Sequence, residues 1–207
     1  MLRLITCVFL GFLFSTSSAF ADGSVRLAAM PVGFDPYPGG GISASYALSE
    51  QLTAEVNYMG HQSNWTGPSA FVHQYTKVIA RYSPSSGSFN VAFGPTVVNE
   101  HLNFYSADGF WSGYDGIDNV KAKGSLITTS QSLAVFAGIG HRWVIKHFMV
   151  GADWVGYVQN VAAISSPTIT DSDDTDETRD GAVKAAKKRQ KSAGYPILGV
   201  LYLGAAF

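Results

Sequence analysis

The sequence predicts an all-β protein, an eight-stranded antiparallel up-and-down β-barrel that spans a membrane with its strands. Three observations predict this class. The chain begins with a secretion signal, and no later run of apolar residues is long enough to form a transmembrane helix. Eight later segments carry apolar residues at every second position, which is the period of a β-strand. The connections between these segments alternate between short and long, as they do in transmembrane barrels.

The first 21 residues have the pattern of a cleaved secretion signal. Arg3 supplies the positive charge, residues 4–14 form an apolar run, and residues 19–21 (Ala-Phe-Ala) have the small-residue pattern of a cleavage site. The apolar run is too short to cross a bilayer as a helix. We therefore expect residues 1–21 to be a cleaved signal peptide and residues 22–207 to form one barrel domain.

The first four strands are expected at 24–32, 42–48, 52–58 and 74–82, where apolar or aromatic residues occupy alternate positions. Successive side chains of a strand point to opposite faces, so each of these segments has one apolar face. Only a short turn around 49–51 separates the second segment from the third. These two segments are therefore expected to form a hairpin.

The last four strands are expected at 89–98, 132–143, 148–159 and 197–207. With about ten residues each, these segments have the length that a tilted transmembrane strand needs. The predicted strands are also poor in charge, because 12 of the 29 charged residues of the chain lie in 164–192. That block falls between two of the predicted strands, in a connection.

The connections predict which strand ends share a side of the membrane. The short ones, near 49–51, 84–88 and 144–147, are expected to be periplasmic turns, with the N-terminus on the periplasmic side. Every long connection then lies outside. These four external loops are expected at 33–41, 60–70, 100–124 and 164–192.

The charged residues of the predicted strands share the face opposite the large aliphatic residues. They are Arg26, Glu55, Lys77, Arg81, Arg142 and Asp153. A membrane barrel would hold this face inside, whereas a soluble eight-stranded barrel of the lipocalin type would turn it outward to water. The alternation of residues is compatible with both barrels.

The C-terminal residues favour the membrane barrel. The chain ends in Leu-Tyr-Leu-Gly-Ala-Ala-Phe, with Phe207 last and apolar residues at alternate positions before it. This end resembles the terminal aromatic signature of bacterial outer-membrane barrels, which their assembly machinery recognises. With its signal, eight strands and four long loops, the chain over 22–207 resembles the small outer-membrane barrels of the OmpA, OmpX and OmpW type. The resemblance implies the outer membrane of a Gram-negative bacterium, contact with the bilayer and lipopolysaccharide, and assembly through Phe207.

The charged face predicts a network of ion pairs inside the barrel. An eight-stranded barrel is only wide enough for its own side chains to fill, and buried charges need partners. We expect Glu55 to face Lys77 or Arg81, and Asp153 to face Arg142. Two roles remain open for this network: a structural plug, or a narrow gated pore whose selectivity the charges set.

Two predicted loops are candidates for surface interaction. The loop 100–124 is rich in aromatic residues that can stack on sugars or a protein partner, or pack on one another. The loop 164–192 is acidic in its first half and basic in its second half, where a short helix is compatible with its Ala and Lys residues. The basic half can pair with the phosphates of lipopolysaccharide. The aromatic candidates are Phe104, Tyr105, Phe110, Trp111 and Tyr114.

One short motif is typical of catalysis. The run His61-Gln62-Ser63-Asn64 resembles the His-x-Ser-Asn motif of the outer-membrane lipid A deacylase, in which a histidine activates a serine. It departs from that family because it lies early in the chain, and because no acidic residue occurs between Asn64 and Glu100. A polar loop entrance is the simpler interpretation, so no catalytic residue is assigned.

The composition excludes several other functions. With 14 Lys and Arg against 15 Asp and Glu, the chain is not a polybasic nucleic-acid binder. It has no zinc-binding pattern and no nucleotide-binding fingerprint, so neither a metal nor another cofactor is expected. We predict a non-enzymatic outer-membrane barrel with a filled lumen, serving envelope structure or surface interaction through its loops. The alternatives are a narrow channel for small solutes and a lipid A-modifying enzyme that uses His61 and Ser63.

Overall fold

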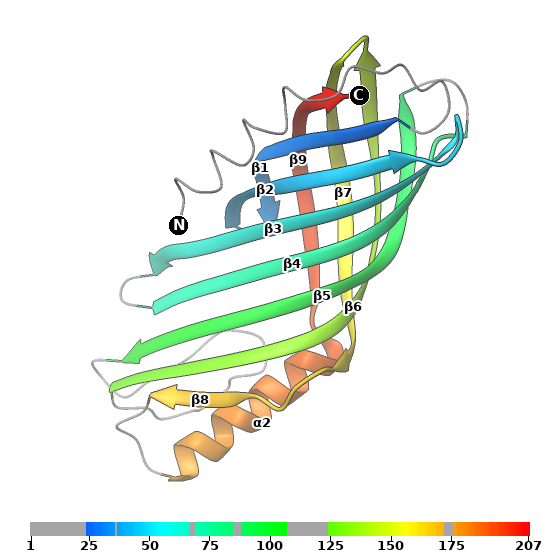
Figure 1. Cartoon of the computed structure of the whole chain (residues 1–207). Helices are drawn as coiled ribbons and strands as arrows, with labels where there is room; N and C mark the ends of the chain where they lie inside the picture. Colours follow the sequence, from blue (N-terminus) through cyan, green and yellow to red (C-terminus); the bar gives the residue numbers. More distant parts are fainter. Residues whose placement is uncertain (1–23, 36, 67–68, 85–87, 107–123, 172–175) are drawn as a thin grey trace.

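The computed structural model describes residues 24–35, 37–66, 69–84, 88–106, 124–171 and 176–207. Eight long strands make up most of this part of the chain (Figure 1). They are β1 (Val25–Asp35), β2 (Tyr37–Ala47), β3 (Leu52–Thr66), β4 (Ser69–Tyr82), β5 (Phe89–Ser106), β6 (Gly124–Ile145), β7 (Phe148–Ala163) and β9 (Gly194–Ala206). The expected signal peptide at 1–21 lies outside the described residues, as do the loop aromatics Phe110, Trp111 and Tyr114.

The eight strands form one antiparallel sheet that closes on itself. The strands β1 to β7 follow one another around the barrel, and β5 pairs with β6. The last strand, β9, lies between β7 and β1 and completes the circle, with Leu27 of β1 opposite Ala205 of β9. The predicted eight-stranded antiparallel up-and-down barrel is therefore confirmed.

Two of the ranges predicted as external loops are mostly strand. In the range 33–41, β1 continues to Asp35 and β2 begins at Tyr37. In the range 60–70, β3 likewise continues to Thr66 and β4 begins at Ser69. The strands continue because their pairing is made by backbone groups, which need no apolar side chain.

The glycines of the first range fit strand packing. Gly39 lies opposite Gly33 on one side and opposite His61 on the other. A Cβ atom built on Gly39 would clash with the Nδ1 atom of His61, so only glycine leaves room for that ring. A glycine run that is typical of a loop in sequence therefore marks a close approach between strands here.

The other two ranges predicted as loops also contain regular structure. Strand β5 continues to Ser106 and β6 begins at Gly124, so the range 100–124 is a shorter connection than predicted. The range 164–192 contains a four-residue strand, β8 (Thr168–Asp171), which pairs with β6, and a helix, α2 (Asp176–Ser192). The helix has acidic residues in its first turn and basic residues in its last, an order that its dipole favours.

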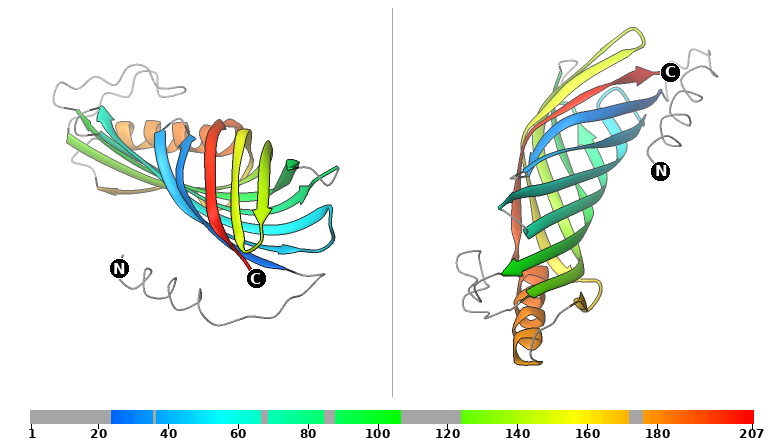
Figure 2. Two further views of the ribbon diagram at one scale, coloured as in Figure 1. Left: turned by 90° about the horizontal axis from the view of Figure 1, so that it is seen from above. Right: turned by 90° about the vertical axis from the view of Figure 1, so that its left-hand side faces the viewer.

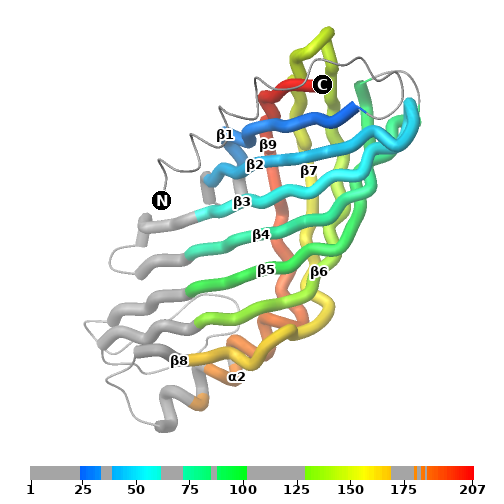
Figure 3. The backbone as a smooth tube through the Cα atoms, viewed as in Figure 1, coloured from blue at the N-terminus to red at the C-terminus, as the bar shows by residue number. Residues whose placement is uncertain are grey.

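The helix marks one end of the barrel, which we call the helix end. It precedes β9 in the chain and lies beyond the end of that strand, at an angle to it (Figures 1 and 2). The opposite end, which we call the turn end, contains the two-residue turn between β6 and β7 and the C-terminus (Figure 3). In that turn Lys146 has a φ of 56°, in the left-handed region that tight hairpin turns use.

The outward face of the barrel is apolar. Val78, Phe93 and Leu203 are 53%, 58% and 53% exposed, and many other aliphatic and aromatic side chains of the strands share this face. Near the helix end the outward face becomes polar. There, the exposed side chain of Gln131 in β6 donates a hydrogen bond of 2.7 Å to Asn99 in β5. Among the described residues, no helix is long and apolar enough to cross a membrane.

Candidate functional site in the barrel interior

Near the turn end, one buried carboxylate joins two arginines from different strands. Arg81 of β4 donates from Nε to Oε2 of Glu55 at 3.1 Å, and Arg142 of β6 donates from Nη2 to Oε1 of the same carboxylate at 2.9 Å. The sequence predicts either Lys77 or Arg81 as the partner of Glu55, and in the structure the partner is Arg81. The side chains of Glu55, Arg81 and Arg142 are buried, so the pairing offsets the cost of removing these charges from water.

Asp153 of β7 pairs with Arg81, whereas the sequence predicts that it faces Arg142. Arg81 donates from Nη1 to Oδ1 of Asp153 at 2.8 Å and thereby links Glu55 to Asp153. The prediction is wrong for two reasons. Asp153 lies opposite Gly140 rather than Arg142, next to an irregularity in the β6–β7 pairing. The closed barrel also lets the side chain of β4 reach across the interior to β7.

Polar and aromatic groups complete this assembly. Tyr202 donates a hydrogen bond of 2.6 Å to Oδ2 of Asp153, and the Arg142 guanidinium lies 4.0 Å from the centre of the Tyr202 ring. We call this assembly the turn-side cluster. Its members are Glu55, Arg81, Arg142, Asp153 and Tyr202.

The two other charged residues predicted for the lumen lie apart from these ion pairs. Arg26 of β1 is only partly buried and donates from Nε to the Ser24 hydroxyl at 3.4 Å. Lys77 of β4 is buried at mid-height, where its Nζ lies 3.7 Å from Sδ of Met59 and 4.4 Å from the centre of the Phe136 ring. Lys77 is therefore held by a sulfur and by a cation–π contact with an aromatic ring.

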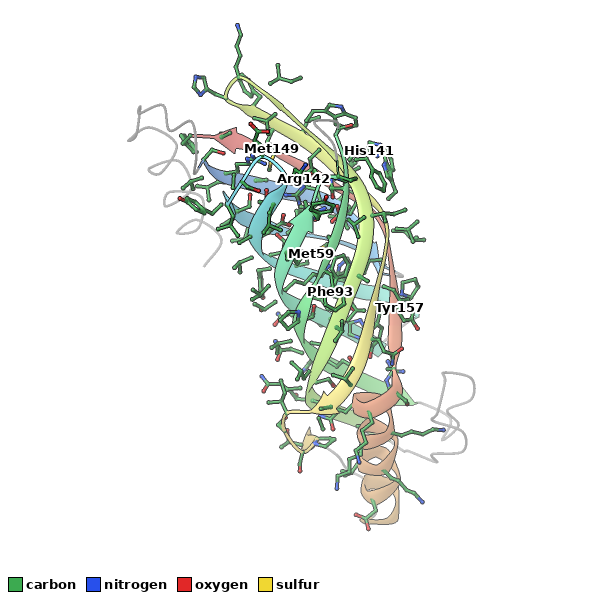
Figure 4. All side chains as sticks on the ribbon, turned by 90° about the vertical axis from the view of Figure 1, so that its right-hand side faces the viewer. Met59, Phe93, His141, Arg142, Met149 and Tyr157 are labelled. Carbon is green, nitrogen blue, oxygen red and sulfur yellow. The ribbon has the colours of Figure 1, made fainter. Side chains whose placement is uncertain are left out.

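A layer of apolar side chains fills the middle of the barrel around Lys77. These side chains come from several strands and are at most 2% exposed. They are Met30, Met59, Ile79, Phe136, Val158, Ile197 and Val200. Figure 4 labels one of them, Met59. All of them belong to one contiguous hydrophobic cluster, which also includes Tyr75 and Tyr195 near the helix end and Tyr202 near the turn end.

At the helix end, a second polar cluster is centred on Glu100 of β5. Its Oε1 accepts hydrogen bonds from Nε2 of His73 at 3.1 Å, from Nη2 of Arg189 at 3.2 Å and from the Tyr195 hydroxyl. The Tyr75 hydroxyl lies 3.1 Å from the other ring nitrogen of His73. We call these five residues the helix-side cluster.

Arg189 connects the helix to the barrel through its salt bridge with Glu100. It is the one member of the helix-side cluster that comes from α2, and its side chain is 10% exposed. Burial opposes the positive charge of its guanidinium, but the neighbouring Glu100 carboxylate outweighs this effect and raises the pKa of Arg189. The salt bridge therefore holds the last turns of α2 against the barrel.

The sequence analysis does not predict the helix-side cluster. Glu100 and Arg189 fall in two separate predicted loops, 100–124 and 164–192. One signal in the sequence does point to part of this cluster: His73 and Tyr75 continue the alternation that places Lys77 and Arg81 on the inward face. No pattern in the sequence indicates that Arg189, about 90 residues further along, would reach Glu100.

The motif at 61–64 is only partly described. His61 is buried on the inward face, where its ring meets that of Tyr75 edge to face at a centroid distance of 5.8 Å. The side chain of Ser63 lies outside the described residues, as do the side chains of Phe104 and Tyr105. His61 thus belongs to the interior packing and faces away from the outward surface.

Together, the fold and the two clusters define a class of protein: a small closed antiparallel β-barrel with an apolar outward face and a filled, charge-paired interior. The N-terminal β-barrel domain of Pseudomonas aeruginosa OprF is similar to this chain, with 12% identity, a TM-score of 0.50, and coverage of 90% of this chain and 98% of that domain. At this identity, the likeness shows the fold alone.

Two further solved structures are similar to the chain. Acinetobacter baumannii CarO2 has 15% identity and a TM-score of 0.46, and the match covers 90% of this chain and 99% of that one. Neisserial surface protein A has 12% identity and a TM-score of 0.41, with 89% and 94% covered. No protein-family model and no curated protein matches the chain.

Proposed function

We propose that this protein is a non-enzymatic outer-membrane barrel of a Gram-negative bacterium, which serves envelope structure or surface interaction through its helix end. The apolar outward face supports a place in a bilayer, where it would contact lipid chains. The closed sheet supports the same place, because its backbone polar groups are hydrogen-bonded within the sheet. The helix end would lie outside, since it contains the two longest connections, between β5 and β6 and between β7 and β9. The bilayer and lipopolysaccharide would be its immediate partners.

The filled interior is the observation that supports a structural role over transport. Two charge-paired clusters and an apolar layer between them occupy the lumen at three levels. An open pore would need these paired charges to separate, which leaves buried charges without partners. The barrel is therefore best understood as a rigid support for what it presents at the helix end.

The assembly machinery is a further expected partner, through Phe207. The backbone N–H of this residue donates to the carbonyl of Val25 at 2.9 Å, so the pairing with β1 continues to the end of the chain. Recognition of Phe207 in the cell stays a prediction, and so does binding of a surface partner by the aromatic residues of 100–124.

The first experiment compares boiled and unboiled samples of the isolated outer-membrane fraction on a denaturing gel. A closed membrane barrel resists detergent until it is heated, so the band is expected to shift on boiling. A protein that is found in the periplasmic fraction and shows no shift would contradict the proposal and favour the soluble barrel.

A conductance measurement tests the channel alternative. We expect the purified barrel to show no steady conductance in a planar bilayer, because the interior is filled at three levels. Conductance that changes in the variants Lys77→Ala or Asp153→Ala would instead identify a narrow channel lined by these charges. The variant Glu50→Ala is the matched control, since Glu50 is exposed in the turn between β2 and β3.

A further inference from the structure

One face of α2 is docked on the barrel. Ala186, Arg189 and Gln190 are buried there, and Arg189 reaches Glu100. The Gln190 side chain donates from Nε2 to the backbone carbonyl of Gln131 at 2.9 Å and to that of Ser165 at 2.7 Å. The orientation of the helix about its own axis is therefore set by contacts with the barrel.

The opposite face of the helix carries a stripe of four exposed lysines. They are Lys184, Lys187, Lys188 and Lys191, and we call them the lysine stripe. Positions that differ by three, four and seven residues lie on one face of a helix, about half a turn away from Ala186 and Gln190 here. The stripe therefore points away from the barrel.

The lysine stripe has a surplus of positive charge. Among the described residues, Asp180 is the exposed acid that shares this face, and it lies next to Lys184. No ion pair within the described residues involves any of the four lysines. Like charges four residues apart repel each other, as Lys184 and Lys188 do. An anion bound along the stripe would relieve this repulsion.

The stripe lies at the level where the outward face of the barrel changes from apolar to polar. On β6, Leu133 is exposed and apolar, and the next outward residue, Gln131, is polar. Gln190 bonds to the backbone of Gln131, so the last turns of α2 stand at this boundary. Next to the helix, Val161 and Ile164 are about half exposed. In a bilayer, this boundary is the level of the lipid headgroups.

We propose that the lysine stripe binds the phosphate groups of anionic lipid headgroups in the outer leaflet. Lysine ammonium groups pair with phosphate oxygens through charge-assisted hydrogen bonds, and their long stems reach over apolar surface. This inference rests on the proposed place of the barrel in the outer membrane and names the partner of its helix end. The bound lipid would hold α2 between the headgroups and the barrel wall.

The test measures lipid binding by native mass spectrometry of the full barrel in a zwitterionic detergent. The probes are lipid A with two phosphates, lipid A with one phosphate, a phosphate-free analogue, and inorganic phosphate. Replacing all four lysines by glutamine is expected to weaken binding of the two-phosphate lipid on the order of 1000-fold. Replacing all four by arginine keeps the charge and should preserve binding. Lys146→Gln, at the turn end, is the single-charge control and should leave binding unchanged.

The outcomes separate this inference from the proposed function. Equal affinity of the glutamine variant and the wild type would overturn the lysine stripe as a lipid site. Equal affinity for the two-phosphate lipid and its phosphate-free analogue would do the same. Binding of inorganic phosphate as tight as that of the lipid would show a free-anion site and overturn the lipid assignment. If the wild type shows no band shift on boiling, the membrane barrel itself fails, whatever the lysines bind.

Discussion

Replacing Glu55 by alanine is expected to lower the free energy of unfolding of the barrel by about 3–5 kcal/mol. The carboxylate of Glu55 is buried and pairs with both Arg81 and Arg142. Without it, two buried guanidinium groups share one remaining acid of the cluster, Asp153, which bonds to Arg81. The loss can be measured as the shift in the urea midpoint of the barrel in detergent micelles, followed by tryptophan fluorescence.

The control for this variant is Glu50→Ala, which removes an exposed carboxylate and is expected to change stability by at most about 0.5 kcal/mol. A double-variant cycle with Arg142→Met separates the ion pair from general packing. If the ion pair stabilises the barrel, the stability lost in the double variant should be smaller than the sum of the two single losses by about 1 kcal/mol or more. A loss below about 1 kcal/mol for Glu55→Ala would contradict the assigned role of the turn-side cluster.

Replacing Arg189 by methionine is expected to release α2 from the barrel while the barrel itself stays closed. The variant removes the salt bridge to Glu100, a hydrogen bond between charged groups that contributes about 1.5–3 kcal/mol. Cleavage within the helix tracks the population of its open form when opening is fast. Trypsin should therefore cut α2 about 10- to 100-fold faster in this variant.

Lys188→Met is the matched control, because it removes one trypsin site from the same helix at an exposed position. Its cleavage rate should stay close to that of the wild type. Equal rates for Arg189→Met and Lys188→Met would show that Gln190 and the rest of the docked face hold the helix without the salt bridge. An unchanged band shift on boiling confirms that neither variant opens the barrel.

Both predictions concern contacts between strands or helices that are far apart in the chain. Glu55 and Arg142 are separated by 87 residues, and Glu100 and Arg189 by 89. The sequence indicates that the charged residues of the strands share one face, because alternation assigns faces within one strand. It does not indicate which charges meet across the interior, since that depends on the register and closure of all eight strands.

The ends of the strands show a second limit of sequence patterns. Alternation of apolar residues ends where a strand leaves the apolar band, but the backbone pairing continues, as in β5 up to Ser106. A range such as 33–41 therefore has the composition of a loop and the structure of a strand. Beyond the apolar band, side chains carry little information about pairing, because the hydrogen bonds of a ladder are made by the backbone.

The sequence by itself determined the fold class and the division of the strands into a charged face and an apolar face, since these follow from local alternation, and its C-terminal residues favoured placing the charged face inside. Only the tertiary structure decided that Arg81 links Glu55 to Asp153, that Glu100 is the centre of a second cluster, and that α2 docks through Arg189. The physical reason is that a period of two assigns each residue to a face. Closure of the sheet then selects which residues on that face come within hydrogen-bonding distance.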